Sequence, residues 1–376
     1  MIVSRLVLSG FRTYDDLDLA LPPGPQVIVG GNTMGKTNLV EAIVVCSRGR
    51  SHRTTTDAEM VGWEAGLARI EATIDGGTVV EVVLAKPGGT PGARKRVRVN
   101  GVPRRTTLLP SVLRSVVFAP EEMLLIVGSP SLRRDELDDL LAGIEPETAA
   151  AMSTYARALT QRNTLLRRIR EEQAGRDQLP FWDETIVREG GTIVRRRLAT
   201  LEGLAGPLAA AHAEIAPAEG RLTLAYRTNA PAGPGETPED ALRRRLAETA
   251  DKELWNGATL IGPHRDDIAF ELDGRELGTF ASRGQQRTAI LALKLAELDL
   301  LTGIDGRPPL LLLDDVFSEL DPERRSHLVR RIAELPQSFV TTTTLDDLDP
   351  LLRGAGTTWR VGSALDGSAR LEPDGA

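Results

Sequence analysis

The chain has 376 residues, 41% of them hydrophobic and 26% charged, as expected of a globular protein with one large domain or two. Its longest apolar runs, such as 310–313, are far too short to cross a bilayer. A single cysteine, Cys46, excludes an internal disulfide. We therefore expect a cytoplasmic protein without a membrane partner. The net charge of −7 argues only mildly against nucleic acid as a partner, because binding depends on where cations cluster.

The N-terminal part is predicted to form strands that lead into one helix. Strands are expected at 2–8, 17–21, 26–29, 70–74 and 79–84. The third strand runs into a glycine-rich turn and a helix that begins near Lys36, with Cys46 on its apolar face and therefore in the core. A later hairpin is predicted around Asn100-Gly101, a pair typical of a tight turn with positive φ. Its arginines alternate with valines, so one face should be basic and the other buried.

A helical segment interrupts this pattern from about 131 to 216. A break at 173–177 predicts an antiparallel pair of helices that forms an arm. The chain then returns to strands and helices. We therefore predict a discontinuous α/β lobe, residues 1–128 plus 255–376, and a mostly helical arm lobe, residues 129–254.

Residues 30–37 fit the phosphate-loop pattern G-x-x-x-x-G-K-[ST] and lie between a buried strand and a helix. Backbone N–H groups of such a loop surround phosphates at the positive end of the helix. Lys36 is expected to contact the β- and γ-phosphates of ATP, and the Thr37 hydroxyl to bind Mg²⁺. The predicted nucleotide-binding residues are Gly30, Gly31, Asn32, Thr33, Met34, Gly35, Lys36, Thr37 and Asn38.

The four leucines at 310–313 are followed by Asp314 and Asp315. An unbroken apolar run is typical of a central parallel strand, and ligands bind where such strands end. Asp314 is therefore expected to hold Mg²⁺ with Thr37, and Asp315 to orient the attacking water. Most ABC-type ATPases carry glutamate at the second position, so the shorter Asp315 predicts slow hydrolysis, which suits a switch.

A second anion site is predicted at Ser282, Gly284 and Gln285, at the start of another helix. The phosphate-loop helix already occupies the phosphates on its own side, so this helix can meet the γ-phosphate only from a second subunit. The motif is similar to the ABC signature S-G-G-Q, with Arg283 in place of the first glycine. Residues 318–321 match the D-loop of the same superfamily. These motifs predict an ABC-type P-loop ATPase head and an ATP-dependent homodimer.

Nearly the whole chain resembles the RecF family of bacterial recombination-repair ATPases. The resemblance rests on 8–14, 35–43, 117–122, 262–267 and 313–321. It implies an ATP- and DNA-binding protein that dimerises with ATP and helps load the RecA recombinase at gaps with RecO and RecR. Two departures stand out. Thr33 occupies a position where the family usually has glycine, and a switch histidine is absent, so a threonine among 341–344 is expected to sense the γ-phosphate.

Basic clusters provide candidate DNA contacts, although a solvated helix face explains any one of them. They are Arg94-Lys95-Arg96 with Arg98, Arg104-Arg105, Arg167-Arg168 with Arg170, Arg195-Arg196-Arg197 and Arg243-Arg244-Arg245. The hairpin at 94–105 is the first candidate.

Two alternatives remain open. The chain could be the ATPase subunit of an ABC-type membrane transporter, although such subunits lack a helical insertion of this kind.

His264, Asp266 and Asp267 could suggest a nuclease metal site, but a structural turn or a dimer contact is favoured, because adjacent side chains on an extended segment point in opposite directions.

Overall fold

A computed structural model describes residues 1–86, 94–317, 320–345, 348–363 and 368–374. The chain forms two compact units. The head unit comprises Met1–Met123, Ala210–Glu219 and Arg287–Ala376, and the arm unit comprises Leu124–Ala209 and Gly220–Gln286. Residues 255–286, which the sequence-based division placed in the ATPase lobe, therefore group with the arm unit, because strands of this segment pair with a strand that follows the long helices.

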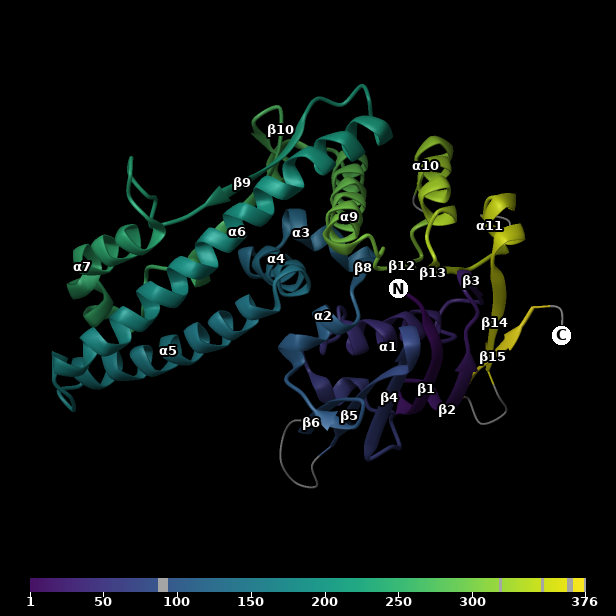
Figure 1. Ribbon diagram of the computed structural model, residues 1–376, viewed down its shortest axis with the longest axis horizontal. Coiled ribbons are helices and arrows are strands. Elements are labelled where there is room, and N and C mark those ends of the chain that lie inside the picture. The colour runs from purple at the N-terminus through teal and green to yellow at the C-terminus, as the bar shows by residue number, and fades with distance from the viewer. Residues whose placement is uncertain (87–93, 318–319, 346–347, 364–367, 375–376) are drawn as a thin grey trace. The chain divides into compact units, whose positions relative to one another are not determined.

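One six-stranded antiparallel sheet of the head unit has the order β2-β1-β4-β5-β6-β7 (Figure 1). Its strands are β1 (Val3–Phe11), β2 (Tyr14–Ala20), β4 (Leu67–Ile74), β5 (Thr78–Ala85), β6 (Arg94–Val99) and β7 (Val102–Pro103). Asn100 and Gly101 join the last two with φ values of 51° and 76°, which confirms the predicted tight turn. Val97 is buried while Arg96 and Arg98 are exposed, so the hairpin has the predicted basic face.

The second six-stranded sheet of the head unit has the order β15-β14-β3-β13-β12-β8. Its strands are β3 (Gly24–Val29), β8 (Ser115–Phe118), β12 (Leu310–Asp314), β13 (Gln337–Thr342), β14 (Thr357–Ser363) and β15 (Ala369–Pro373). All neighbouring strands are parallel except β14 and β15. Every residue of β12 is buried, and this strand lies between β13 and β8, which confirms the predicted central parallel strand.

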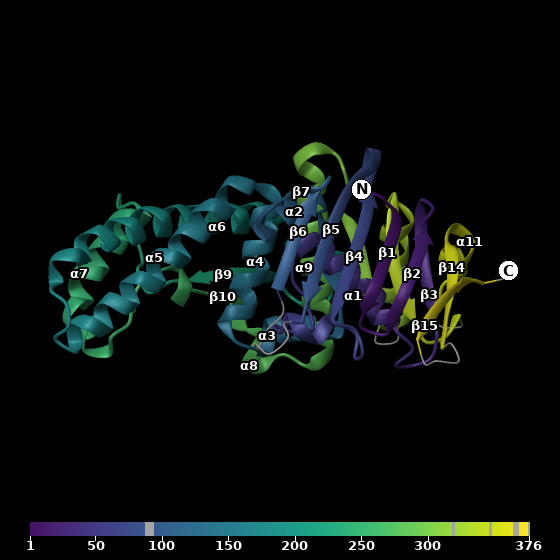
Figure 2. The ribbon, with the colours of Figure 1, turned by 90° about the horizontal axis from the view of Figure 1, so that it is seen from below.

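Helix α1 (Lys36–Arg48) packs between the two sheets and contacts strands of both (Figure 2). Cys46 on this helix is fully buried, as predicted, and burial raises the pKa of its thiol to about 12. Besides the C-terminal end of a long helix of the arm unit, the other helices with residues in this unit are α2 (Leu109–Val112), α9 (Arg283–Asp305), α10 (Pro322–Ala333) and α11 (Pro350–Ala355). Short 3₁₀ turns are η1 (Asp57–Met60), η2 (Asp75–Gly77), η3 (Thr106–Leu108) and η4 (Pro120–Met123).

The arm unit is mostly helical, as predicted. Its helices are α3 (Leu124–Val127), α4 (Pro130–Ile144), α5 (Pro146–Arg170), α6 (Leu179–Ile215, which ends in the head unit), α7 (Pro238–Asn256) and α8 (Leu277–Phe280), with 3₁₀ turns η5 (Arg176–Gln178) and η6 (Pro263–Arg265). The break between α5 and α6 confirms the predicted helix pair (Figure 1). A three-stranded sheet, β11-β10-β9, holds β9 (Leu222–Arg227), β10 (Asp267–Leu272) and β11 (Arg275–Glu276). Within the described ranges of the chain, no helix is both long and apolar enough to span a membrane.

Candidate nucleotide-binding site

The phosphate loop joins the buried strand β3 to α1, where the sequence placed it. Gly35 caps α1 with φ 105°, and a Cβ there would lie 2.9 Å from the Thr13 hydroxyl oxygen. A Cβ on Gly30 would lie 2.8 Å from the carbonyl oxygen of Val361, so both positions require glycine. Thr33 has φ 68°, a left-handed conformation that costs a β-branched residue about 1–2 kcal/mol. This conformation explains why glycine suits the position.

Lys36 is the first residue of α1 and is buried. Its ammonium group donates hydrogen bonds to the carbonyl oxygens of Gly30 at 2.7 Å and Gly31 at 2.9 Å. Burial lowers the pKa of Lys36, and the carboxylates of Asp315 and Asp314 oppose that shift. The two hydrogen bonds place the Lys36 side chain against the loop, where a phosphate would bind.

Asp314 and Thr37 meet although they are 277 positions apart in the sequence. The Thr37 hydroxyl donates to Oδ1 of Asp314 at 3.1 Å, and Asp314 is almost completely buried. A carboxylate and a hydroxyl side by side are oxygen donors of the kind that Mg²⁺ prefers. Asp315 follows in a left-handed conformation with φ 52°, which turns the chain as β12 ends.

Thr341 is a member of this site whose role the sequence did not identify. Its hydroxyl donates to Oδ1 of Asp314 at 2.6 Å and accepts from the backbone N–H of Asp315 at 2.9 Å. The parallel register of β12 and β13 pairs Asp314 with Thr341 and causes this contact. The Thr341 hydroxyl is thus hydrogen-bonded to both aspartates. A γ-phosphate sensor among the threonines at 341–344 remains a prediction, and the exposed Thr343 is its candidate.

A buried carboxylate, Glu41, connects α1 to the loop that follows it. Arg12 donates to Glu41 at 2.6 and 2.8 Å, and Arg53 donates at 3.1 Å. Burial tends to raise the pKa of Glu41, but hydrogen bonds from Arg12 and Ser51 outweigh this effect and hold the pKa below its usual value. Asn38, predicted to contact nucleotide, donates to Thr13 at 2.9 Å and accepts from Arg53 at 3.0 Å.

The signature residues lie at the start of α9, in the arm unit. Ser282 accepts from the backbone N–H of Gln285 at 3.3 Å, and the Gln285 side chain accepts from the backbone N–H of Ser282 at 3.0 Å. This reciprocal pair is a capping box, so Ser282 and Gln285 stabilise the helix start. A Cβ on Gly284 would lie no closer than 3.8 Å to Ser282 Oγ, so there is space beside the backbone here. Of the D-loop, Ser318 and Glu319 lie outside the described residues.

The polar residues of 262–267 contact different partners within the arm unit. His264 Nδ1 accepts a hydrogen bond from the Tyr155 hydroxyl at 2.7 Å, and its Nε2 lies 3.2 Å from the carbonyl oxygen of Thr259. Asp266 and Asp267 pair elsewhere: Asp266 accepts from Tyr226 at 2.6 Å, and Asp267 accepts from Arg133 at 2.7 Å. These contacts support the structural interpretation of the segment rather than a nuclease metal site.

Basic clusters differ in how far carboxylates neutralise them. In the clusters at 195–197 and 243–245 every arginine contacts a carboxylate of the arm unit: Arg195–Glu239, Arg196–Glu145, Arg197–Asp138, Arg243–Glu184, Arg244–Glu236 and Arg245–Glu248. On the hairpin of the head unit, Arg96, Arg104 and Arg105 are exposed and have no side-chain partner among the described residues. The hairpin therefore carries the more available positive charge.

Together, the phosphate loop, the paired aspartates and the parallel sheet define a P-loop ATPase of the ABC type. Residues 2–351 match the RecF/RecN/SMC N terminal domain family. The chain is 39% identical over 373 residues to the DNA replication and repair protein RecF of Herpetosiphon aurantiacus, covering 93% of this chain and 95% of that relative. It is 38% identical to the protein of the same name in Bacillus subtilis, covering 95% and 97%. The chain belongs to the RecF family.

Solved structures agree with this assignment. A recombination mediator protein RecF of the RecFOR pathway, described as RecF-ATP, superposes with a TM-score of 0.87 and 29% identity, covering 98% of this chain and 97% of that one. The RecF-ATPrS form gives a TM-score of 0.86 at 30% identity, with 98% of each chain covered. An Smc head bound to a domain of ScpA shares the fold, with a TM-score of 0.55 and 16% identity.

Proposed function

We propose that the chain is an ATP-dependent DNA-binding switch in recombinational repair, which closes as a homodimer on DNA at gaps or junctions and helps load the RecA recombinase in the cytoplasm. The observation that most supports this proposal is the hydrogen bond between Thr37 and Asp314 beside the phosphate loop. The family's DNA replication and repair proteins and the ATP-bound relative support it. RecO- and RecR-like partners follow from the family and from the RecFOR pathway named for that relative.

ATP would bind along Gly30–Asn38, with Lys36 on its outer phosphates. Thr37 and Asp314 would hold Mg²⁺, which neutralises phosphate charge. Ser282, Gly284 and Gln285 of a second copy would contact the γ-phosphate, so that closure depends on ATP. Loss of that phosphate on hydrolysis would release the DNA.

Asp315 is proposed to orient the attacking water. A hollow of about 10 Å³, at the lower limit of what can hold one water, is lined in part by Asp314, Asp315 and Arg287. Because aspartate reaches less far than glutamate, slow hydrolysis remains our expectation, and slow hydrolysis would keep the clamp closed long enough to recruit partners.

A transporter subunit is the weaker alternative. The relatives reported above are replication and repair proteins, and they cover nearly the whole chain, including the arm. This similarity to replication and repair proteins therefore favours DNA over a membrane permease as the partner.

The test combines DNA binding by fluorescence anisotropy with light scattering, each without nucleotide, with ADP and with ATP. Wild type should dimerise and bind DNA only with ATP, and high salt should weaken the DNA complex. Lys36→Ala should lose ATP binding, whereas Ser282→Arg should bind ATP but remain monomeric. A wild-type protein that binds ATP yet stays monomeric and ignores DNA would contradict the proposal.

A further inference from the structure

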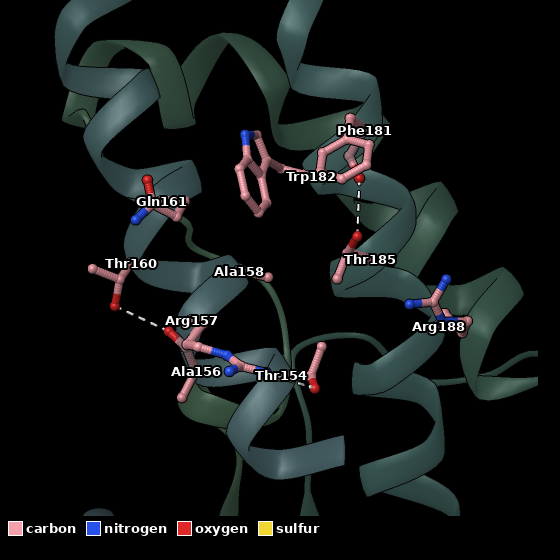
Figure 3. A pocket seen from close by; sticks show the side chains of 10 residues that line it. All are labelled: Thr154, Ala156, Arg157, Ala158, Thr160, Gln161, Phe181, Trp182, Thr185 and Arg188. Carbon is pink, nitrogen blue, oxygen red and sulfur yellow. Dashed lines mark hydrogen bonds between the residues drawn. The ribbon is translucent and has the colours of Figure 1, made fainter. Parts of the chain in front are cut away.

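An open groove of about 730 Å³ lies between α5 and α6 of the arm unit, and the proposed ATP cycle does not use it. Arg157 and Gln161 of α5 form part of one wall, and Phe181, Trp182 and Arg188 of α6 form part of the other. In Figure 3 the indole of Trp182 extends from α6 into the space between the two helices.

Two aromatic rings provide flat apolar surface in this groove. Phe181 is 68% exposed, unusually so for a large apolar side chain. Its ring packs edge-on against Trp182, with 4.9 Å between ring centroids and an interplanar angle of 80°. Trp182 is half-buried and packs against the arm core, which holds the pair in place. A planar ligand can therefore stack here without first ordering the side chains.

Charge in the groove is entirely positive. Its lining includes Arg157 and Arg188, both exposed, and no carboxylate. The acids beside Trp182 are engaged elsewhere: Asp183 accepts from Arg162 at 2.7 Å, and Glu184 lies 3.5 Å from Arg243. Arg188 also lies 2.9 Å from its neighbour Glu189, an exposed pair that contributes little to stability, so Arg157 carries the more available positive charge of the two.

We propose that this groove binds single-stranded nucleic acid, with a base stacked on the face of Trp182 beside Phe181 and the adjoining phosphates on Arg157 and Arg188. Aromatic platforms flanked by cations bind single strands in this way, because every base has a flat π face. Gln161 is exposed without a side-chain partner among the described residues, so its amide can meet a base edge.

A peptide fits less well. Extended peptides need partners for their backbone, but the Thr160 and Thr185 hydroxyls in the groove donate to the carbonyl oxygens of Ala156 and Phe181 on their own helices. The inference rests on the proposed DNA binding and deepens it. A single-strand site on the arm, in addition to a duplex site, would favour DNA in which both forms are present, such as a gap.

The test titrates full-length protein with an oligothymidylate of about 12 nucleotides, following tryptophan fluorescence and the anisotropy of a labelled strand. Stacking should quench wild-type fluorescence. Since the chain has four tryptophans, Trp182→Phe assigns the signal: it should keep the affinity and lose most of the quenching. Phe181→Ala should weaken single-strand binding about tenfold and leave duplex binding unchanged. Phe280→Ala, at a 74% exposed phenylalanine outside the groove, is the matched control and should bind as wild type.

Each other outcome decides a different question. Duplex binding with ATP, but no quenching that depends on Trp182, would overturn the groove assignment and leave the proposed function standing. Failure of wild type to bind either DNA would overturn the proposed function itself. Quenching by a short peptide of aspartate and phenylalanine, but not by oligothymidylate, would assign the groove to a protein partner and contradict our inference.

Discussion

Thr341 holds together the two aspartates that follow β12. Thr341→Val keeps the shape of the side chain but removes the hydroxyl, so the buried Asp314 loses one hydrogen bond and the Asp315 N–H loses its acceptor. We expect ATP hydrolysis to fall by roughly tenfold and the free energy of unfolding to fall by about 1–3 kcal/mol. Steady-state phosphate release and urea unfolding measure the two effects.

The matched control is Thr343→Val, since Thr343 is exposed and directly follows the same strand. It should leave stability unchanged, and if Thr343 senses the γ-phosphate it should lower hydrolysis alone. Equal stability loss in the two variants would contradict the role assigned to Thr341.

His264 predicts a pH dependence of stability. A carbonyl oxygen can only accept, so Nε2 donates to Thr259 and the neutral Nδ1 accepts from Tyr155. Burial lowers the pKa of His264 from 6.5 to about 4, so between these values the unfolded chain binds the proton more readily. Stability should therefore fall as pH drops through this window, by about 2 kcal/mol at pH 5. His264→Gln cannot titrate, so its thermal unfolding should depend less on pH than that of wild type. Parallel pH profiles would refute this.

At the scale of elements, α9 joins the signature turn to a buried ion cluster. Lys294 of α9 lies 2.8 Å from Glu122 and 3.3 Å from Glu297, and all three side chains are nearly inaccessible. Lys294→Met would remove the ammonium group that these two buried carboxylates contact. We expect a loss of about 3–5 kcal/mol in the free energy of unfolding, measured in urea. Adding Glu122→Gln should recover part of it, because one of the two buried carboxylate charges is then removed. Unchanged stability in Lys294→Met would show that the carboxylates are neutral or solvated.

At the scale of the whole molecule, DNA binding must overcome a net charge of −7, so it depends on local cations that remain available. Arg104→Ala with Arg105→Ala should weaken duplex binding and reduce the slope of log K against log salt by up to about 1.8, or about 0.9 for each phosphate that the protein no longer neutralises. Arg243→Ala with Arg244→Ala is the control, because carboxylates already engage both arginines. Anisotropy at several salt concentrations measures the slopes, and equal slopes for all proteins would exclude the hairpin as the DNA surface.

The sequence by itself determined the features that depend on neighbouring residues. The phosphate loop, the buried strand before Asp314, the Asn100-Gly101 turn and the break between the arm helices all depend on local spacing and turn chemistry, and the structure places them as predicted. The capping box at Ser282 is equally local.

Only the tertiary structure decided which distant side chains meet. Thr341 lies beside Asp314 because of the register of two parallel strands. Glu41 accepts hydrogen bonds from Arg12 and Arg53, which come from separate segments of the chain. The groove at Trp182 requires α5 and α6 to lie side by side, and only the folded chain shows which arginines lack a carboxylate partner. Residue type and spacing encode backbone geometry over a few residues, whereas strand register and helix packing depend on burial across the whole core.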